Sequence, residues 1–201
     1  MDFGALKQKL EGLGYAVSCF ASAREAAEYL DGQVDGTSVG FGGSVTLEQM
    51  GLFDRLASHN EVAWHHKVPK GPERGEALKK ALAARIYFSS VNALAETGEI
   101  INIDNTGNRV GSTWFGHEKL YLVAGRNKIA PDFESALHRA RNIAAPLNAK
   151  RLGRKTPCAA RGDRCYDCNS PERICRGLSV FWRCPAGEKV EVVLINEELG
   201  Y

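Results

Sequence analysis

Four cysteines lie close together near the C-terminal end of the sequence, where their thiolates could bind a metal. They follow the pattern C-x6-C-x2-C-x6-C, and Cys184 comes shortly after and could replace one of them. Two residues between cysteines let both sulfurs reach one centre from a single turn, and four thiolates suit a structural zinc ion or a [4Fe–4S] iron–sulfur cluster. The predicted metal ligands are Cys158, Cys165, Cys168 and Cys175.

Two disulfides or free thiols are the alternatives to a bound metal. Disulfides persist in oxidising compartments, and the chain begins without the apolar core of a signal peptide. No stretch reaches the apolar length that spans a bilayer. We therefore expect a cytoplasmic protein without membrane contact, in which metal binding is favoured over disulfides. The six-residue gaps match no single zinc pattern, so the choice between iron–sulfur cluster and zinc stays open.

The charge of the chain disfavours nucleic acid as a partner. The 201 residues include 26 basic and 24 acidic side chains, which leaves a formal net charge of +2. Basic residues are in excess only between residues 150 and 183. Positive charge around a cysteine cluster stabilises deprotonated sulfur, and the aromatic residues there form no stacking stripe for RNA.

The elements that would position such residues alternate between helix and strand. Leucines at helical spacing begin the chain, short β-branched and aromatic runs follow helices, and glycine or proline separates them. The expected helices cover 3–13, 23–30, 45–56, 73–85 and 134–144, and the expected strands cover 15–21, 37–43, 60–66, 99–104 and 118–125, with 86–94 as a strand running into a short helix.

This alternation predicts an α/β fold with a parallel-rich sheet flanked by helices. We expect a single domain over residues 1–201, with an α/β core from 1 to 150. The remaining residues, 151–201, would form a cysteine-rich loop and a terminal hairpin that packs on the core. The hairpin would join the runs 178–184 and 189–196 through the turn PAGE.

The first candidate strand end carries three glycines and a serine in the sequence GFGGS, residues 40–44. Ligands of α/β folds bind where strands end and helices begin, because free backbone N–H groups converge there. Gly42 and Gly43 allow close approach of a ligand, Ser44 adds a hydroxyl, and Glu48 is a candidate acid or base. The simpler alternative is a glycine-rich turn in which Ser44 caps a helix and Glu48 lies on the surface.

The second candidate strand end continues into DNTGNR, residues 104–109. Arg109 could bind a carboxylate or phosphate through two hydrogen bonds, and Asp104 could act as a base. Two further strand ends add Asn92 and Lys128, the latter as an anion binder. The alternative is a polar turn with a surface arginine and a solvated lysine. The candidate ligand-binding residues are Gly42, Gly43, Ser44, Asn92, Thr106, Gly107, Asn108, Arg109 and Lys128, and the candidate catalytic residues are Glu48 and Asp104.

The sequence indicates no catalytic role for any histidine. His65 and His66 are adjacent in an expected strand, so their side chains would face opposite ways and could not share a metal.

Several long segments, in order, resemble the LUD (lactate-utilisation) domain family, whose namesake is lactate-utilisation protein C. The resemblance implies a fold of the type shared by ribose-5-phosphate isomerase, glucosamine-6-phosphate deaminase and CoA transferases, in which phosphate or carboxylate ligands bind at glycine-bearing strand ends. It points to Gly42, Gly43 and Ser44 and to residues 104–109. The segments are GFGGSVTLEQMGLFD, SSVNALAETGEIINIDNTGNRV, GRNKIAPDFESALHRARNIAAPLNAKRL and EELGY.

The resemblance also implies iron–sulfur partner proteins that act with the family in oxidising L-lactate to pyruvate. Our first hypothesis is accordingly an iron–sulfur or metal-binding redox component linked to lactate or organic-acid utilisation. The alternative is an enzyme or sensor that binds a small anionic ligand, an organic acid or a phosphorylated compound, and uses the metal only structurally. The third hypothesis is a subunit that works only in a complex.

Overall fold

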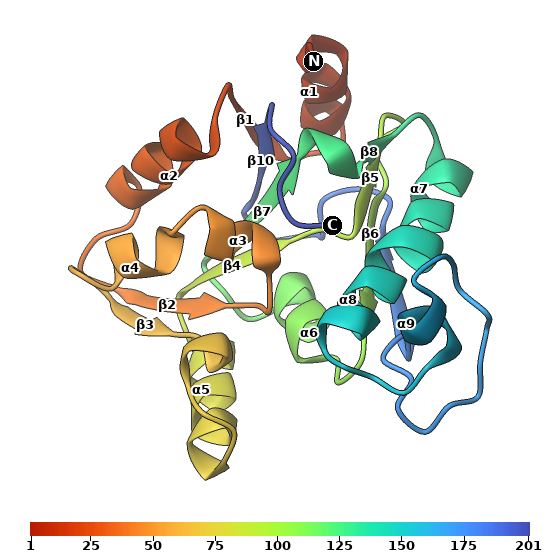
Figure 1. The fold of residues 1–201 in the computed structure, drawn as a ribbon. Coiled ribbons are helices and arrows are strands. Elements are labelled where there is room, and N and C mark those ends of the chain that lie inside the picture. Colours follow the sequence, from red (N-terminus) through yellow and green to blue (C-terminus); the bar gives the residue numbers. More distant parts are fainter.

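The computed structural model describes all 201 residues and shows a six-stranded parallel sheet at the centre of the molecule (Figure 1). Each neighbouring pair of strands in this sheet is parallel, and the order is β1-β10-β7-β4-β2-β3. The predicted parallel-rich α/β fold is therefore confirmed. The strands are β1 (Ala16–Phe20), β2 (Ser38–Phe41), β3 (Glu61–Ala63), β4 (Ile86–Ser90), β7 (Lys119–Gly125) and β10 (Val190–Ile195).

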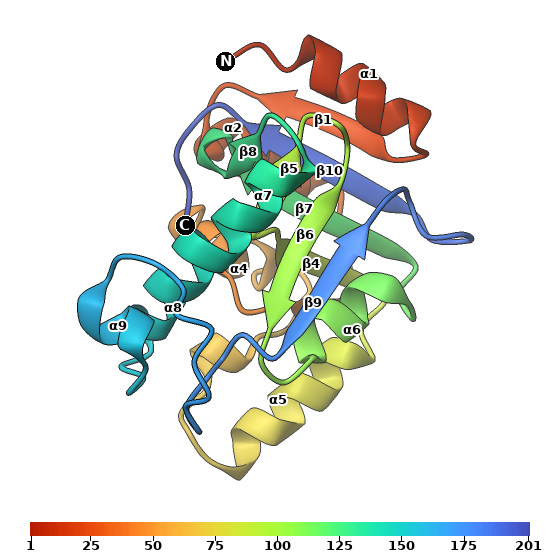
Figure 2. The same ribbon diagram turned by 90° about the vertical axis from the view of Figure 1, so that its right-hand side faces the viewer.

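A smaller sheet of four strands, in the order β8-β5-β6-β9, packs beside the first (Figure 2). In it β6 pairs antiparallel with both β5 and β9, whereas β5 and β8 are parallel. The strands are β5 (Ala93–Ala95), β6 (Ile100–Asp104), β8 (Ile129–Ala130) and β9 (Gly177–Phe181).

Helices cover both sheets. None of them combines the length and the apolar character that crossing a membrane needs. A π turn (Ala140–Ala144) joins two of them, and 3-10 turns lie at His65–Lys67 and Arg126–Lys128. The α-helices are α1 (Gly4–Gly12), α2 (Ala23–Gly32), α3 (Val45–Gln49), α4 (Leu52–Leu56), α5 (Pro72–Leu82), α6 (Asn108–Trp114), α7 (Phe133–Arg139), α8 (Ala145–Arg151) and α9 (Pro157–Arg161).

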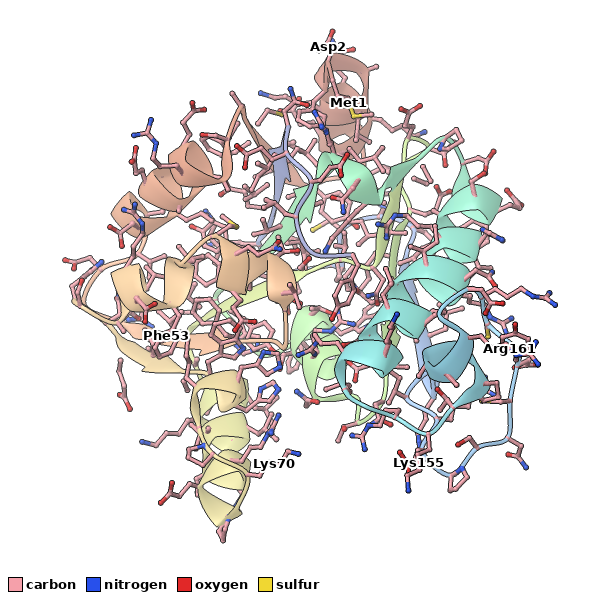
Figure 3. The ribbon with its side chains drawn as sticks, viewed as in Figure 1. Met1, Asp2, Phe53, Lys70, Lys155 and Arg161 are labelled. Carbon is pink, nitrogen blue, oxygen red and sulfur yellow. The ribbon has the colours of Figure 1, made fainter.

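Alternate residues of β10 divide the apolar interior into two clusters. Val193 and Ile195 join the cluster under α2, α3 and α4, while Val192 and Leu194 join the one shared with α1 and the smaller sheet. Alternation is expected because successive side chains of a strand point to opposite faces. A third cluster fills the space between the smaller sheet and α7. The side chains of all these layers are drawn in Figure 3.

The predicted terminal hairpin is wrong. Strand β9 pairs with β6 in the smaller sheet, whereas β10 lies between β1 and β7 in the large one. All six residues of β10 are buried, as a central parallel strand requires, but β9 is only partly buried and forms an edge. The turn residues PAGE therefore separate strands of different sheets, and residues 151–201 supply a central strand of the core.

The helix expected after β4 is also wrong, because residues 93–95 form strand β5. The alanine-rich sequence favours helix locally. However, pairing with β6 and β8 satisfies its backbone groups in a completely buried position.

Strand β2 packs so closely on α5 that residue 40 must be glycine. A Cβ there would collide with the backbone oxygen of Ala81 and would lie 2.9 Å from Cδ2 of Tyr87. We expect Gly40→Ala to lower the free energy of unfolding by about 1–3 kcal/mol, since overpacking forces the helix away from the sheet. Urea unfolding followed by circular dichroism measures the change.

Gly75→Ala is the matched control, because Gly75 lies in α5 with nothing within 4 Å of an added Cβ. It should raise the free energy of unfolding by roughly 0.5–1 kcal/mol, the usual gain for glycine in a helix. Equal effects of the two substitutions would contradict the close contact of β2 with α5.

Candidate functional site

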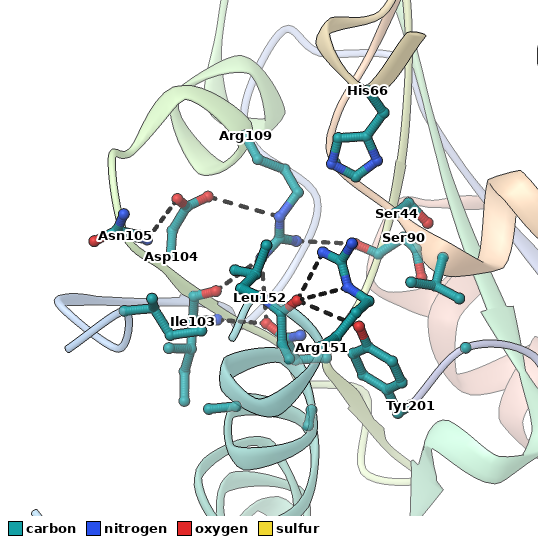
Figure 4. A pocket seen from close by; sticks show the side chains of 18 of the residues that line it. Ser44, His66, Ser90, Ile103, Asp104, Asn105, Arg109, Arg151, Leu152 and Tyr201 are labelled. Atoms are coloured by element: carbon teal, nitrogen blue, oxygen red, sulfur yellow. Dashed lines mark hydrogen bonds and ion pairs between the residues drawn. The ribbon is translucent and has the colours of Figure 1, made fainter. Parts of the chain in front are cut away.

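A cleft with a volume of about 280 Å³ opens where strands of the two sheets end (Figure 4). Residues after β2, β4 and β6 form one side of it, and α8 forms another. Parallel strands of the large sheet end at the same edge, which brings turns that are distant in sequence together. The main-chain turns and polar side chains here make this the candidate ligand site.

The cleft gathers most of the residues that the sequence singled out, but not all of them. Glu48 is exposed and does not line the cleft, so the structure gives no support to its expected catalytic role. Gly42 and Gly107 are also absent from its walls. The predicted residues that do line it are Gly43, Ser44, Asn92, Asp104, Thr106, Asn108, Arg109 and Lys128.

Arg109 is buried, and its guanidinium donates to protein acceptors on every side. Its Nη1 donates to the carbonyl oxygen of Ser90 at 3.1 Å and to Oδ1 of Asn102 at 2.5 Å. Its Nη2 donates to Oδ1 of Asn92 at 3.2 Å and to the carbonyl oxygen of Ile103 at 2.9 Å. A guanidinium has five N–H groups, and four are used here.

The fifth N–H of Arg109, at Nε, faces the carboxylate of Asp104 at 3.6 Å. Four of the five N–H groups of Arg109 therefore donate within the protein and the fifth faces a carboxylate, which leaves the expected anion clamp without support from these contacts. Gly42 makes room for it, because a Cβ at residue 42 would lie 2.8 Å from Cγ of Arg109. Arg109 and Gly42 are positioning residues that join the ends of the two sheets.

The carboxylate of Asp104 is occupied by the backbone of the loop that follows it. Oδ1 accepts the N–H groups of Asn105, Thr106 and Gly107, at 2.7, 3.2 and 3.1 Å. Oδ2 accepts the N–H of Val110 and faces Arg109. Both oxygens are engaged, so Asp104 shapes the turn and is not free to act as the expected base.

Sequence reasoning missed His65 and His66, which both line the cleft. The expected strand stops at Ala63, and the two residues form a 3-10 turn instead of alternating. Their ring centroids are 4.6 Å apart. A Cβ added to Gly43 would lie 3.0 Å from Nε2 of His66 and 3.4 Å from Nε2 of His65, so both rings approach this glycine. The nearby breakers Pro69 and Gly71 were the available signal that the strand ends early.

Both imidazoles are neutral at pH 7. Burial, and then the positive charge of Arg74, lowers the pKa of His65 to about 4. Burial, followed by His65, Arg151 and Arg74, lowers the pKa of His66 to about 4 as well. The cleft can thus present imidazole nitrogens as donors or acceptors beside a cationic wall.

The walls of the cleft carry an excess of positive charge. Asp104 has the one side-chain carboxylate among the lining residues, and Arg109 faces it. Arg74, Arg151 and Arg154 also line the cleft, and none of these three forms an ion pair. Arginines without partners in a cleft of this size favour a small anion as the ligand.

Arg151 is held at the rim by neutral groups. Its Nε and Nη2 donate to Oδ1 of Asn148 at 3.2 and 2.9 Å, and the hydroxyl of Tyr201 donates to the same oxygen at 3.3 Å (Figure 4). Some of its N–H groups remain available. The C-terminal residues Gly200 and Tyr201 thereby form part of the wall.

The four clustered cysteines do not form a metal site in this structure. All six cysteines of the chain are free thiols, so the disulfide alternative does not occur either. No group of three or more histidine, cysteine or acidic side chains comes close enough to hold a metal ion. The thiols as placed do not fit zinc or a [4Fe–4S] cluster, and the metal prediction is not confirmed.

Two of these thiols contact groups of their own neighbouring residues and not one another. Cys165 accepts the N–H of Asp167 at 3.3 Å, and Cys158 lies 3.3 Å from the hydroxyl of Thr156. Lys155 and Arg161, near the start of the segment that carries the four clustered cysteines, lie at the periphery of the molecule (Figure 3). The segment reaches the cleft through Ile174.

Comparison with known proteins identifies the domain. The family model described as "LUD domain" matches residues 4–195. No curated protein matches the chain. A solved structure, of a DUF162 family protein from Deinococcus radiodurans, is similar with a TM-score of 0.54 and 10% sequence identity, over 95% of this chain and 94% of that one. At this identity the likeness shows the fold.

The role of Arg109 as a positioning residue predicts that even lysine cannot replace it. Arg109→Lys offers at most three donors and leaves buried acceptors unpaired, so the free energy of unfolding should fall by about 2–4 kcal/mol. Arg85→Lys is the control, because Arg85 pairs with Glu118 on the surface and should change stability by less than about 1 kcal/mol. Urea unfolding of both variants measures this, and equal losses would contradict the assigned role.

The lowered pKa of the two histidines predicts a loss of stability in acid. Below their ordinary value of 6.5 the unfolded chain binds protons that the folded state resists until about pH 4, so stability should fall as pH falls through this window. His66→Gln should make the fall shallower, whereas His138→Gln, exposed and outside the cleft, should not. Chemical unfolding at successive pH values tests this, and identical slopes for wild type and His66→Gln would refute it.

Proposed function

Because this chain belongs to the LUD domain family, we propose that its cleft binds a small anionic ligand, an organic acid or a phosphorylated compound. The observation that carries the proposal is the imbalance of charge in the walls. Arg74, Arg151 and Arg154 have no side-chain carboxylate as partner, and the single side-chain carboxylate of the cleft, of Asp104, faces Arg109. An anion would supply the missing charge.

The family name supports an organic acid within this class. It refers to lactate utilisation, and a hydroxy acid offers one carboxylate for the arginines and a hydroxyl for neutral side chains. The two imidazoles beside Gly43 and the hydroxyls of Ser44 and Thr46 are such groups in the same cleft. We infer that the arginines bind the carboxylate of the ligand and that the imidazoles and hydroxyls contact its other polar groups.

Binding of a ligand here is better supported than the redox role. The cleft residues come together from distant parts of the chain, whereas the cysteine thiols do not form a ligand set. An iron–sulfur redox partner protein remains an expectation from the family resemblance, and the proposal does not depend on it.

Anion binding is tested by calorimetry and thermal unfolding with lactate, succinate and ribose 5-phosphate. We expect at least one of them to bind and to raise the melting temperature. Arg151→Gln should weaken binding about tenfold, because a hydrogen bond to a charged group contributes roughly 1.5–3 kcal/mol. Arg24→Gln, at an exposed position outside the cleft, should bind like the wild type. Failure of every anion to bind, or equal binding by Arg151→Gln, would refute the proposal.

A further inference from the structure

A lysine amine is buried in the wall of the cleft without a carboxylate near it. Lys128, in the 3-10 turn after β7, is 3% exposed and lines the cleft. Its Nζ lies within hydrogen-bond distance of Oγ1 of Thr46 at 2.8 Å, Oγ of Ser90 at 2.6 Å and the carbonyl oxygen of Val91 at 3.0 Å. All three partners are neutral, so a charge on Nζ would have no counter-charge.

Two further cations make the charged form of this amine still less favourable. Burial first, and then Arg139 and Arg109, lowers the pKa of Lys128 well below its usual range. Both arginines are held by hydrogen bonds. Arg139 donates to the carbonyl oxygens of Asn127 and Asn92 at 2.7 and 2.6 Å, and Arg109 makes the four bonds described above. A lysine that is desolvated and close to other cations is held as a neutral amine with two N–H groups, so one neighbouring hydroxyl, of Thr46 or Ser90, donates to its nitrogen. When that hydroxyl turns away, the lone pair of Nζ is a nucleophile.

The chain leaves space in front of the amine. Gly200 adopts a left-handed conformation with φ of +62°, and a Cβ there would lie 3.3 Å from Nζ of Lys128 and would crowd Oγ1 of Thr46. The absence of a side chain at residue 200 therefore keeps the surroundings of Nζ open toward the cleft, which Gly200 itself lines.

We propose that Nζ of Lys128 forms an imine with the carbonyl carbon of a 2-oxo acid bound in the cleft. The inference rests on the proposed binding of an anion, and it narrows the ligand class to acids that carry a carbonyl group. The arginines of the cleft bind the carboxylate, and the adjacent carbonyl carbon is presented to the amine. An imine at that carbon makes the neighbouring C–H or C–C bond easier to break, because the nitrogen can accept the electron pair.

The atoms of this step balance without an oxidant or a metal. The nitrogen lone pair attacks the carbonyl carbon, and one N–H proton passes to the carbonyl oxygen to give a carbinolamine. The hydroxyl then leaves with the second N–H proton as water, and the C=N bond forms. Ser90 can relay these protons, because its Oγ lies 2.6 Å from Nζ and 3.2 Å from Oγ1 of Thr46.

Pyruvate and lactate make a decisive pair of probes, because they differ only at the carbon that the amine would attack. The full-length protein is incubated with each acid and sodium cyanoborohydride, which reduces an imine to a stable secondary amine. We expect pyruvate, and not lactate, to add one reduced adduct per chain, mapped by peptide mass spectrometry to Lys128. Lys128→Arg should abolish the adduct, whereas Lys189→Arg, at an exposed position, should retain it.

Calorimetry with lactate separates failure of this inference from failure of the proposed function. If lactate binds but pyruvate leaves Lys128 unmodified, the imine is refuted and anion binding stands. If reduction labels surface lysines and spares Lys128, the imine is refuted as well. If neither acid binds or labels Lys128, the imine is refuted, and binding of succinate or ribose 5-phosphate decides whether the proposed anion binding stands. Peptide mapping uses the wild-type protein, so the result does not depend on the folding of the Lys128 variant.

Discussion

A guanidinium ion that is removed from water needs an acceptor for each of its N–H groups, and in this protein the acceptors of Arg109 come from both sheets. Ser90 is the last residue of β4 in the large sheet, and Asn102 and Ile103 belong to β6 of the small one. The position of one side chain therefore fixes how the two sheet edges face each other. The cleft lies between these edges, so its shape depends on Arg109, whose guanidinium is bonded to the protein.

The arginines in and behind the walls of the cleft divide into two groups by burial. Arg109 and Arg139 are almost completely withdrawn from solvent beside the neutral Lys128, and all three side chains are bonded to protein groups. Arg74 and Arg151, nearer the solvent, face the opening with donors to spare. The inner arginines raise the positive potential without occupying the space, and the outer ones keep N–H groups available for a ligand.

The sequence predicted the parts of this arrangement that local pattern determines. Apolar runs predicted the parallel strands, and glycines or polar groups after them predicted the turns that meet at the cleft. It did not predict pairing between distant segments, which is why β5 and the terminal hairpin were assigned incorrectly. Roles within the cleft also escaped prediction, because whether Arg109 or Asp104 is free depends on acceptors and donors that only the fold brings near.

The place of β10 has a consequence for how the protein emerges from the ribosome. Until residues 190–195 leave the exit tunnel, the nascent chain has β1 and β7 without the strand that pairs with both of them. The large sheet stays divided, and two rows of backbone groups remain open to intermolecular pairing. The large sheet can therefore close only after β10, the strand that follows all the others in the chain, has been made.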